Sequence, residues 1–257
     1  MLYVVGFGPG DEKRMTMEAR EVLSRVDVIV GYRAYNALLR SIFPEKEYLE
    51  TGMRGEMERC RLAVEETLKG REVAVVCSGD AGIYGMAGLV LETAEQMDAT
   101  ERIEIEVVAG VTAALSGAAL LGAPLGHDLA IISLSDLMTP WELVLKRLKA
   151  AAEADFCIAL YNPSSHSRQA HFTEACEILL KYRGEDTLCG LARNIGREGE
   201  CAQTVLLKDL AETQVDMQTV VLIGNSRTRK IGNYMVTPRG YLEKYGDRQQ
   251  NDKETTA

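Results

Sequence analysis

The 257-residue chain lacks several features that would mark it as a particular class of protein. No apolar run reaches the roughly 18 residues that a membrane-spanning helix needs, so we expect a soluble protein. Six cysteines are scattered without a Cys-x-x-Cys pair. This spacing argues against a zinc ribbon or an iron–sulfur cluster and predicts reduced thiols in a cytoplasm. Met1 leads directly into an apolar segment, from which we expect no signal peptide.

The chain also has few histidines, and it has fewer basic than acidic residues. Lys and Arg total 29 against 38 Asp and Glu, which gives a net charge of −9 and argues against nucleic acid as a partner. An anionic small molecule remains compatible, because it meets a local cluster of arginines rather than the net charge. Two of the three histidines, His166 and His171, are close in sequence. Their spacing does not place them on one helix face, so we expect no metal site.

What the chain does contain is a set of glycine-rich turns after short apolar segments. Residues 2–5 predict a buried strand, which ends in Gly6-Phe-Gly-Pro-Gly-Asp11. Glycine lets the backbone pass close to a ligand. However, the turn lacks the Gly-Lys-Ser/Thr of a P-loop and the spacing of a dinucleotide fingerprint. Pro9 also removes an N–H that a phosphate would use. This turn alone fits an ordinary strand-to-helix connection equally well.

The same order of strand, glycine turn and helix recurs along the first half of the chain. Strands predicted at 73–77 and 103–108 end in Ser78-Gly-Asp-Ala-Gly-Ile-Tyr-Gly85 and Ala109-Gly-Val-Thr-Ala113. This order predicts an α/β fold with a mostly parallel sheet. Because the carboxyl ends of parallel strands share one edge, the three turns should line one ligand crevice. Asp80 is placed to receive a sugar hydroxyl or a cationic group, or else to cap the following helix.

Apolar periodicity predicts the remaining elements. Helices are expected at 16–26 with Thr16 as the cap, and at 56–68, 86–97, 114–121, 142–152 and 168–181. Further strands are expected at 28–30, 129–134, 156–160, 187–191, 203–207 and 219–223, partly antiparallel because some connections are short. The breaker-rich stretch 122–128 predicts a boundary between an α/β domain at 1–121 and another at 122–245. The polar tail 246–257 is expected to be disordered.

Together, the turns carry a family resemblance. Val4-Val-Gly-Phe-Gly-Pro-Gly-Asp11, Ser78-Gly-Asp-Ala-Gly-Ile-Tyr84 and Gly110-Val-Thr-Ala113 resemble the ordered signatures of tetrapyrrole methylases, which use S-adenosylmethionine. The resemblance extends from residue 2 to about residue 240. Residues 126–141, 160–165 and 192–196 resemble precorrin-3B C(17)-methyltransferases of cobalamin synthesis. Ser78-Gly-Asp-Ala81 replaces the Gly-Gly-Asp-Pro that is usual in uroporphyrinogen methylases, a departure that matches the precorrin-3B subgroup.

The resemblance implies a fold and a ligand. It implies two α/β domains with the active-site cleft between them, a homodimer, and S-adenosylmethionine folded in the cleft and released as S-adenosylhomocysteine. By the motif match, the cofactor-binding residues would be Pro9, Gly79, Asp80, Ile83, Tyr84, Thr112, Ala113, Asn162, Ala192 and Thr219. The implied reaction methylates carbon 17 of precorrin-3B or cobalt-precorrin-3 and contracts the ring.

This chemistry fits the residue inventory. A sulfonium methyl is already activated, so the protein mainly positions donor and acceptor, and no covalent nucleophile is needed. Ring contraction requires proton handling, for which Asp136, His127 and Arg193 are candidate catalytic residues by position. A structural cap or ion pair is the alternative for each. Candidate clamps for the substrate's carboxylates are Arg33, Arg54, Arg193 and Arg197.

Two alternatives stay open from the sequence. The chain could be another methylase on the same fold, acting on a different precorrin, on uroporphyrinogen, or on protein or RNA. It could also be a non-catalytic nucleotide-binding module, which would bind the adenosyl ligand without methyl turnover. The sequence does not distinguish a cobalt-containing substrate from a cobalt-free one.

Overall fold

The computed structural model describes residues 1–164 and 169–245. The chain forms two compact units, each described by itself below. The first comprises Met1–Ser116 together with the short segment Ile195–Glu198, and the second comprises Gly117–Asn194 and the described residues from Gly199 onward. The division falls within helix α5 (Ala113–Leu121). The boundary predicted from the sequence, between residues 121 and 122, is at the end of that helix. The expected tail at 246–257 lies outside the described residues.

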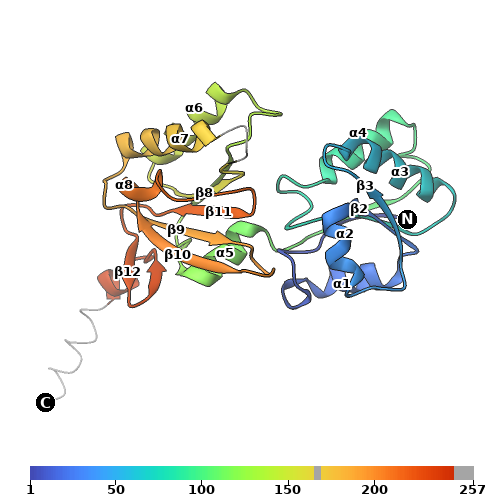
Figure 1. Ribbon diagram of the computed structural model, residues 1–257, viewed down its shortest axis with the longest axis horizontal. Coiled ribbons are helices and arrows are strands. Elements are labelled where there is room, and N and C mark those ends of the chain that lie inside the picture. Colours follow the sequence, from blue (N-terminus) through green and yellow to red (C-terminus); the bar gives the residue numbers. More distant parts are fainter. Residues whose placement is uncertain (165–168, 246–257) are drawn as a thin grey trace, which may run out of the picture. The chain divides into compact units, whose positions relative to one another are not determined.

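The first unit contains a five-stranded parallel sheet with the strand order β3-β2-β4-β1-β5. Figure 1 labels two of these strands, β2 and β3. Its strands are β1 (Leu2–Gly6), β2 (Val28–Tyr32), β3 (Glu47–Thr51), β4 (Val73–Cys77) and β5 (Ile105–Val108). β1 and β4 are buried along their whole length, which explains why their sequences are continuously apolar rather than alternating. Because all five strands run the same way, their carboxyl ends share one edge.

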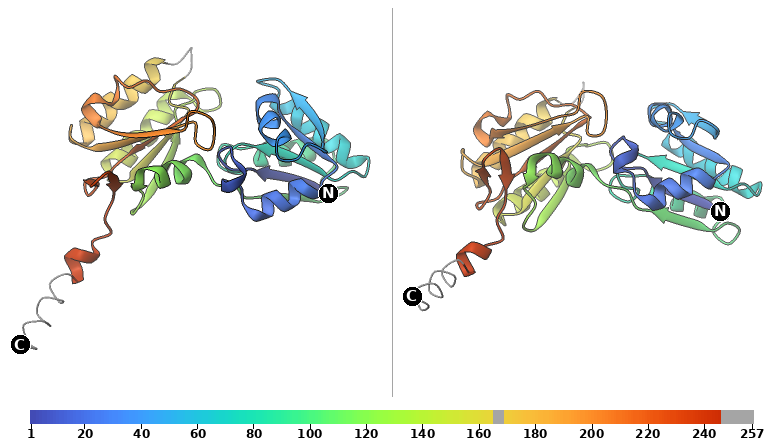
Figure 2. Two further views of the ribbon diagram at one scale, coloured as in Figure 1. Left: turned by 60° about the horizontal axis from the view of Figure 1, so that its bottom comes forward. Right: turned by 90° about the horizontal axis from the view of Figure 1, so that it is seen from below.

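Helices cover both faces of this sheet (Figure 2), because successive strand side chains point to opposite faces. Leu2 and Val4 of β1 pack with α3 (Glu56–Leu68) and α4 (Ala87–Gln96). Tyr3 and Val5 pack on the other face with the remaining helices, α1 (Met17–Arg25) and α2 (Arg33–Arg40). The short 3-10 helix η1 (Glu12–Arg14) precedes α1. The predicted cap is confirmed, since Thr16 Oγ1 accepts the N–H of Ala19 at 3.1 Å.

The second unit contains a mixed sheet with the order β10-β9-β11-β8-β7. Its strands are β7 (Leu129–Ser133), β8 (Cys157–Tyr161), β9 (Leu188–Arg193), β10 (Cys201–Leu206) and β11 (Thr219–Ile223). β7 and β8 pair in parallel and the other neighbours pair antiparallel, as the short connections predicted. Helices α6 (Trp141–Glu153), α7 (Gln169–Tyr182) and α8 (Leu207–Leu210) pack on one face. Leu121 of α5 contacts Gly190 of β9.

A third, small sheet was not predicted. It consists of β12 (Arg229–Ile231), β13 (Tyr234–Val236) and β6 (Gly122–Ala123), with β13 in the middle. β6 lies in the stretch that the sequence analysis assigned to a breaker-rich junction. Strands of two or three residues are too short to show an alternating pattern, so sequence periodicity does not reveal them.

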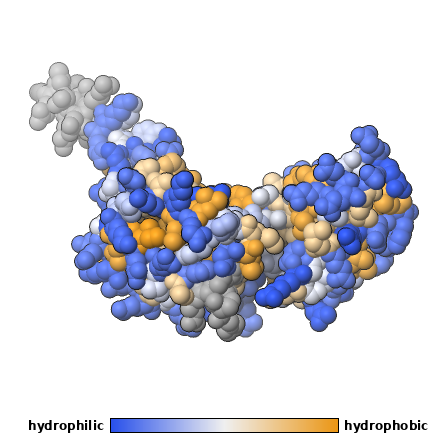
Figure 3. All heavy atoms as spheres, turned by 90° about the horizontal axis from the view of Figure 1, so that it is seen from above, coloured by the Kyte–Doolittle hydropathy of each residue, from blue (hydrophilic) through white to orange (hydrophobic). Residues whose placement is uncertain are grey.

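The surface of the described residues includes apolar side chains, and most of the cysteines are buried. Along 1–164 and 169–245, no helix combines the length and apolar character required to cross a membrane. On the face drawn in Figure 3, apolar areas are interspersed with hydrophilic surface. All six cysteines are free thiols, and five of them are buried.

Candidate functional site

The three glycine turns of the first unit meet at the carboxyl edge of its sheet. β1 lies between β4 and β5, so the turns that follow these strands are neighbours. The N–H of Gly8 donates to the Gly79 carbonyl at 3.1 Å, and the N–H of Gly79 donates back to the Gly8 carbonyl at 2.7 Å. A Cβ on Gly110 would lie 2.1 Å from the Gly79 oxygen and 2.3 Å from the Gly6 oxygen. The predicted convergence is confirmed, and it requires glycine where the backbones touch.

The Asp80 carboxylate forms hydrogen bonds within its own turn, 78–85, and to the turn 109–113. Its Oδ1 accepts the N–H groups of Gly82 and Ile83 at 2.9 and 3.0 Å. Its Oδ2 accepts the N–H of Gly110 at 3.0 Å. The alternative that Asp80 caps the following helix is wrong, because the N-cap of α4 is Met86 and has no side-chain cap bond. Asp80 therefore organises its own turn and links it to the turn after β5.

The cofactor residues predicted in the first unit all lie in these converging turns. They are Pro9, Gly79, Asp80, Ile83, Tyr84, Thr112 and Ala113. Pro9 and Thr112 are buried, whereas Ile83 is 37% and Tyr84 56% exposed. Tyr84 has a φ of 53°, in the left-handed region that a bulky residue rarely adopts. The turns thus present the partly exposed side chains of Ile83 and Tyr84 beside closely approached backbone.

A cysteine lies directly beneath the turns but does not supply a nucleophile. Cys77 is the last residue of β4, and its Sγ lies 3.7 Å from the Val5 carbonyl oxygen and 3.8 Å from that of Asp80. Burial raises the pKa of the Cys77 thiol to about 11, so the group is protonated at neutral pH. Because the thiolate is the reactive form, Cys77 is inert there.

In the second unit, most of the predicted residues lie along one edge of the mixed sheet. β7, β8 and β9 end at this edge and the antiparallel β11 begins there, because Ser133 pairs with Tyr161 and Thr219 with Arg193. The predicted residues at this edge are Asp136, Asn162, Ala192, Arg193 and Thr219. Asn162 has a φ of 52°, and its Nδ2 donates to Ser133 Oγ at 2.9 Å.

One carboxylate that the sequence analysis missed, Asp216, holds two of these residues. Its Oδ2 lies 2.6 Å from Arg193 Nη2, and its Oδ1 accepts the Thr219 hydroxyl at 2.8 Å. Arg193 is about half exposed, so this ion pair orients the side chain more than it stabilises the fold. No motif signals Asp216, which precedes β11 in an ordinary polar turn.

Asp136 faces helix α7. Its Oδ2 is 4.0 Å from Nε2 of His171, and the His171 ring stacks on Trp141 with 3.9 Å between the ring centroids. Nδ1 of His171 is buried and makes no hydrogen bond to the described residues. In the sequence, the nearest histidine to His171 is His166, which lies outside the described residues. In the described part of the chain, no group of three or more potential ligands could hold a metal ion.

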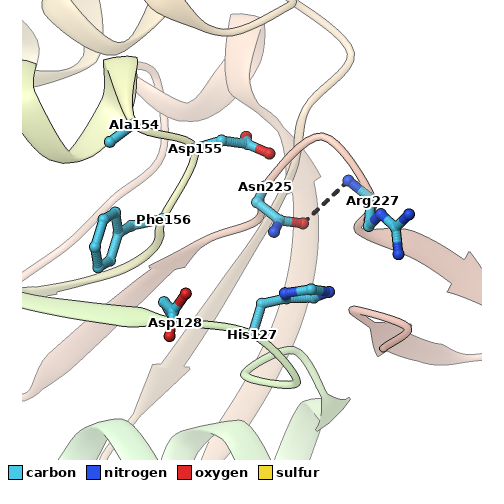
Figure 4. A pocket seen from close by; sticks show the side chains of 7 residues that line it. All are labelled: His127, Asp128, Ala154, Asp155, Phe156, Asn225 and Arg227. Atoms are coloured by element: carbon cyan, nitrogen blue, oxygen red, sulfur yellow. Dashed lines mark hydrogen bonds between the residues drawn. The ribbon is translucent and has the colours of Figure 1, made fainter. Parts of the chain in front are cut away.

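His127 lies apart from Asp136 and Arg193. It precedes β7, at the opposite edge of the sheet, and its Nε2 is 3.1 Å from the Pro238 carbonyl oxygen. There it lines a pocket of about 230 Å³ together with Asp128, Ala154, Asp155, Phe156, Asn225 and Arg227 (Figure 4). The length of β7 therefore separates His127 from Asp136, its rival as the candidate acid or base.

The candidate carboxylate clamps differ in their surroundings. Arg33 is 79% exposed, with Nε 3.8 Å from Glu50, and Arg54 is exposed with a φ of 66°. Arg197 is half-buried in the first unit, where its Nε donates to the Pro9 carbonyl at 3.0 Å and its Nη2 donates to Ser78 Oγ at 2.8 Å. Arg33 and Arg54 are thus open to a ligand, whereas Arg197 is engaged with the turns themselves.

Comparison with known sequences identifies relatives along nearly the whole chain. The family model of tetrapyrrole (corrin/porphyrin) methylases matches residues 1–211. The chain is 45% identical over 246 residues to the cobalt-factor III methyltransferase of Priestia megaterium, covering 95% of this chain and 46% of that protein. It is 44% identical over 241 residues to a probable cobalt-factor III C(17)-methyltransferase of Salmonella typhimurium, covering 94% and 99%. The chain therefore spans about half the length of the first relative.

Solved structures share the fold. The crystal structure of the methyltransferase CobJ has a TM-score of 0.86 at 40% identity, covering 92% of this chain and 99% of that one. A uroporphyrin-III C-methyltransferase from Thermus thermophilus, solved in complex with S-adenosylhomocysteine, has a TM-score of 0.66 at 22% identity, covering 87% and 91%. The second similarity is at the level of the fold alone.

Proposed function

Because the chain belongs to the tetrapyrrole (corrin/porphyrin) methylase family, we propose that it methylates carbon 17 of a precorrin-3-type tetrapyrrole with S-adenosylmethionine, in cobalamin biosynthesis. The name of the Priestia relative supports the substrate, and that of the Salmonella relative supports both the substrate and the position of methylation. The observation that carries the methyl-donor site is the convergence of the turns at 6–11, 78–85 and 109–113 on one sheet edge.

These turns fit a sulfonium nucleoside better than a phosphate ligand. They offer close backbone approach and the exposed side chains of Ile83 and Tyr84, and Pro9 supplies no N–H. When bound, S-adenosylmethionine supplies a methyl group that is already activated for transfer. The task of this chain is then to position donor and acceptor, which can contribute several orders of magnitude in rate. Asn162, Ala192 and Thr219 are proposed as further cofactor contacts.

Ring contraction is the step for which we propose an acid or base. Asp136 is the candidate, because it stands at the carboxyl edge of the second sheet and faces the His171 imidazole at 4.0 Å. Arg193, oriented by Asp216, is proposed to hold a substrate carboxylate, for which a guanidinium is well shaped. His127 has no part in this proposal, because it lies at the opposite edge of the same sheet.

Turnover with separate substrates tests the function. The protein is incubated with S-adenosylmethionine and, in parallel, precorrin-3B, cobalt-factor III and uroporphyrinogen III, and the products are identified by mass and absorbance. We expect methylated, ring-contracted product from one of the first two, which also decides whether the substrate carries cobalt. Product from uroporphyrinogen alone would favour a different methylase. Binding of S-adenosylhomocysteine without any product would favour a non-catalytic module.

Assembly and location form part of the same proposal. We propose a homodimer, on the family resemblance, and a cytoplasmic location, on the scattered cysteines whose thiols are all free. Light scattering at micromolar concentration should give twice the 28.3 kDa chain mass. A monomeric mass under these conditions would contradict the dimer and leave the proposed reaction unaffected.

A further inference from the structure

We propose that Arg197 is a positioning residue, which holds the turns 6–11 and 78–85 in the arrangement that the methyl donor requires. The identity of that ligand rests on the proposed function. Arg197 lies in the segment Ile195–Glu198, which belongs to the first unit although the strands before and after it, β9 and β10, belong to the second sheet.

The guanidinium group joins the two turns directly. Its Nε donates to the backbone carbonyl of Pro9 at 3.0 Å, and its Nη2 donates to the hydroxyl of Ser78 at 2.8 Å. That hydroxyl also lies 3.5 Å from the Gly8 carbonyl oxygen. Because a guanidinium is planar and its donors have fixed directions, two such bonds fix the spacing between the groups that accept them. Pro9, and Gly79 next to Ser78, are predicted cofactor residues.

The surroundings of Arg197 make these bonds costly to break. The guanidinium carbon lies 5.8 Å from the ring centroid of Tyr35, and Tyr35 packs edge-to-face against Phe7 of the first turn. Burial lowers the pKa of Arg197 and raises that of the Tyr35 hydroxyl, so both groups lie partly out of water. A charged donor in such a setting forms stronger hydrogen bonds than an exposed one and is more costly to leave unpaired.

Two glycines allow the segment to lie directly on the first turn. A Cβ on Gly10 would be 2.7 Å from Arg197 Cγ and 2.9 Å from the Gly196 carbonyl oxygen. Gly196 has a φ of 70°, and a Cβ there would be 3.0 Å from the Asp11 nitrogen. The aliphatic part of Arg197 therefore occupies space that any larger residue at position 10 would fill. The absence of side chains at both positions is a requirement of this contact.

A positioning role for Arg197 and a role as a substrate clamp predict different kinetics. A clamp on tetrapyrrole carboxylates would raise KM for the tetrapyrrole when Arg197 is replaced. A residue that positions the donor turns would instead raise KM for S-adenosylmethionine and Kd for S-adenosylhomocysteine. KM for the tetrapyrrole should then change little.

The test uses Arg197→Met, Arg197→Lys and a matched control, Arg40→Met. Arg40 lies in the same unit, pairs with Glu50 at 2.9 Å and stacks over Tyr48 at 4.3 Å, and both partners belong to β3 and not to the turns. We expect Arg197→Met to weaken S-adenosylhomocysteine binding by about 10- to 100-fold in calorimetry, the range for a lost charged hydrogen-bond partner. Arg197→Lys should recover part of the affinity, since an ammonium can still donate to one acceptor. Arg40→Met should bind like wild type even where its Tm falls.

Amide hydrogen exchange gives a readout that needs no ligand. Arg197→Met should speed exchange at residues 7, 8 and 10 and at residues 78–80, and Arg40→Met should not. Wild-type-like exchange and affinity in Arg197→Met, or equal losses in both variants, would overturn the inference. Faster exchange in Arg197→Met with no ligand binding by the wild type would support the positioning role while rejecting the proposed cofactor.

Discussion

At the scale of single residues, Asp80 can shape a ligand site through the backbone groups that it holds. Asp80→Asn keeps the size of the side chain but turns one acceptor into a donor, so at least one of three backbone N–H groups loses its partner. We expect folding stability and S-adenosylhomocysteine affinity to fall together, each by about 1–3 kcal/mol. Chemical denaturation and calorimetry on the same samples measure both. Weaker binding at unchanged stability would favour the direct ligand contact considered from the sequence.

A second prediction at the scale of single residues concerns Asp136 and the proposed ring contraction. Asp136→Asn keeps the shape and removes the ionisable group. If Asp136 moves the proton in ring contraction, methyl transfer should persist while contracted product falls by about 10²- to 10⁴-fold. A methylated, uncontracted product should accumulate, visible by mass and absorbance. Asp128→Asn, at the opposite edge of the sheet, is the control and should give the normal product. Contraction at the wild-type rate in Asp136→Asn would exclude this role.

At the scale of elements, the residue that caps helix α1 also contacts the sheet edge where the three glycine turns meet. Thr16 accepts the N–H of Ala19 and also donates its hydroxyl to the Ala109 carbonyl at 3.2 Å, in the turn after β5. Thr16→Ala removes both bonds and should lower the free energy of unfolding by about 0.5–2 kcal/mol, the usual cost of an N-cap. Urea denaturation measures the change, and Thr16→Ser, which keeps the hydroxyl, should lie close to wild type. Equal stability of Thr16→Ala and wild type would show that the cap contributes nothing.

At the scale of the whole molecule, we expect the buried thiols to lower the free energy of unfolding at alkaline pH. Burial raises the pKa of Cys60 and Cys77 to about 11 and that of Cys176 to about 12, from an ordinary 9.0. Below the ordinary pKa these thiols are protonated in both states. Above it the unfolded chain releases protons that the folded chain keeps, so the stability that the thiols contribute is lost as pH rises.

The free energy of unfolding should therefore fall from about pH 9, the ordinary pKa of the thiol, to about pH 11, the pKa of Cys60 and Cys77 in the folded chain. Urea denaturation under reducing conditions at several pH values measures the slope. Cys176→Ala removes one of the titrating groups and should show a shallower fall, whatever its absolute stability. An identical slope in wild type and Cys176→Ala would remove the buried thiol as the cause.

The sequence by itself determined the elements whose signals are local. β4 (Val73–Cys77) and α3 (Glu56–Leu68) have the predicted bounds, because a continuous apolar run and a helical period are read within a few residues. The meeting of the three glycine turns was also predictable, since parallel strands place their carboxyl ends at one edge. The cofactor and catalytic assignments within those turns and the second sheet remain predictions.

Only the tertiary structure decided which side chains meet across long stretches of chain. It separated His127 from Asp136 along the length of β7, and it placed Asp216 beside Arg193 and His171 beside Asp136. It also brought Arg197 to Pro9 across 188 positions. Local sequence patterns do not predict such pairs, because each partner is an ordinary residue of its own turn or helix. The meeting is set by the path of the whole chain, which the packing of the sheets and their helices determines.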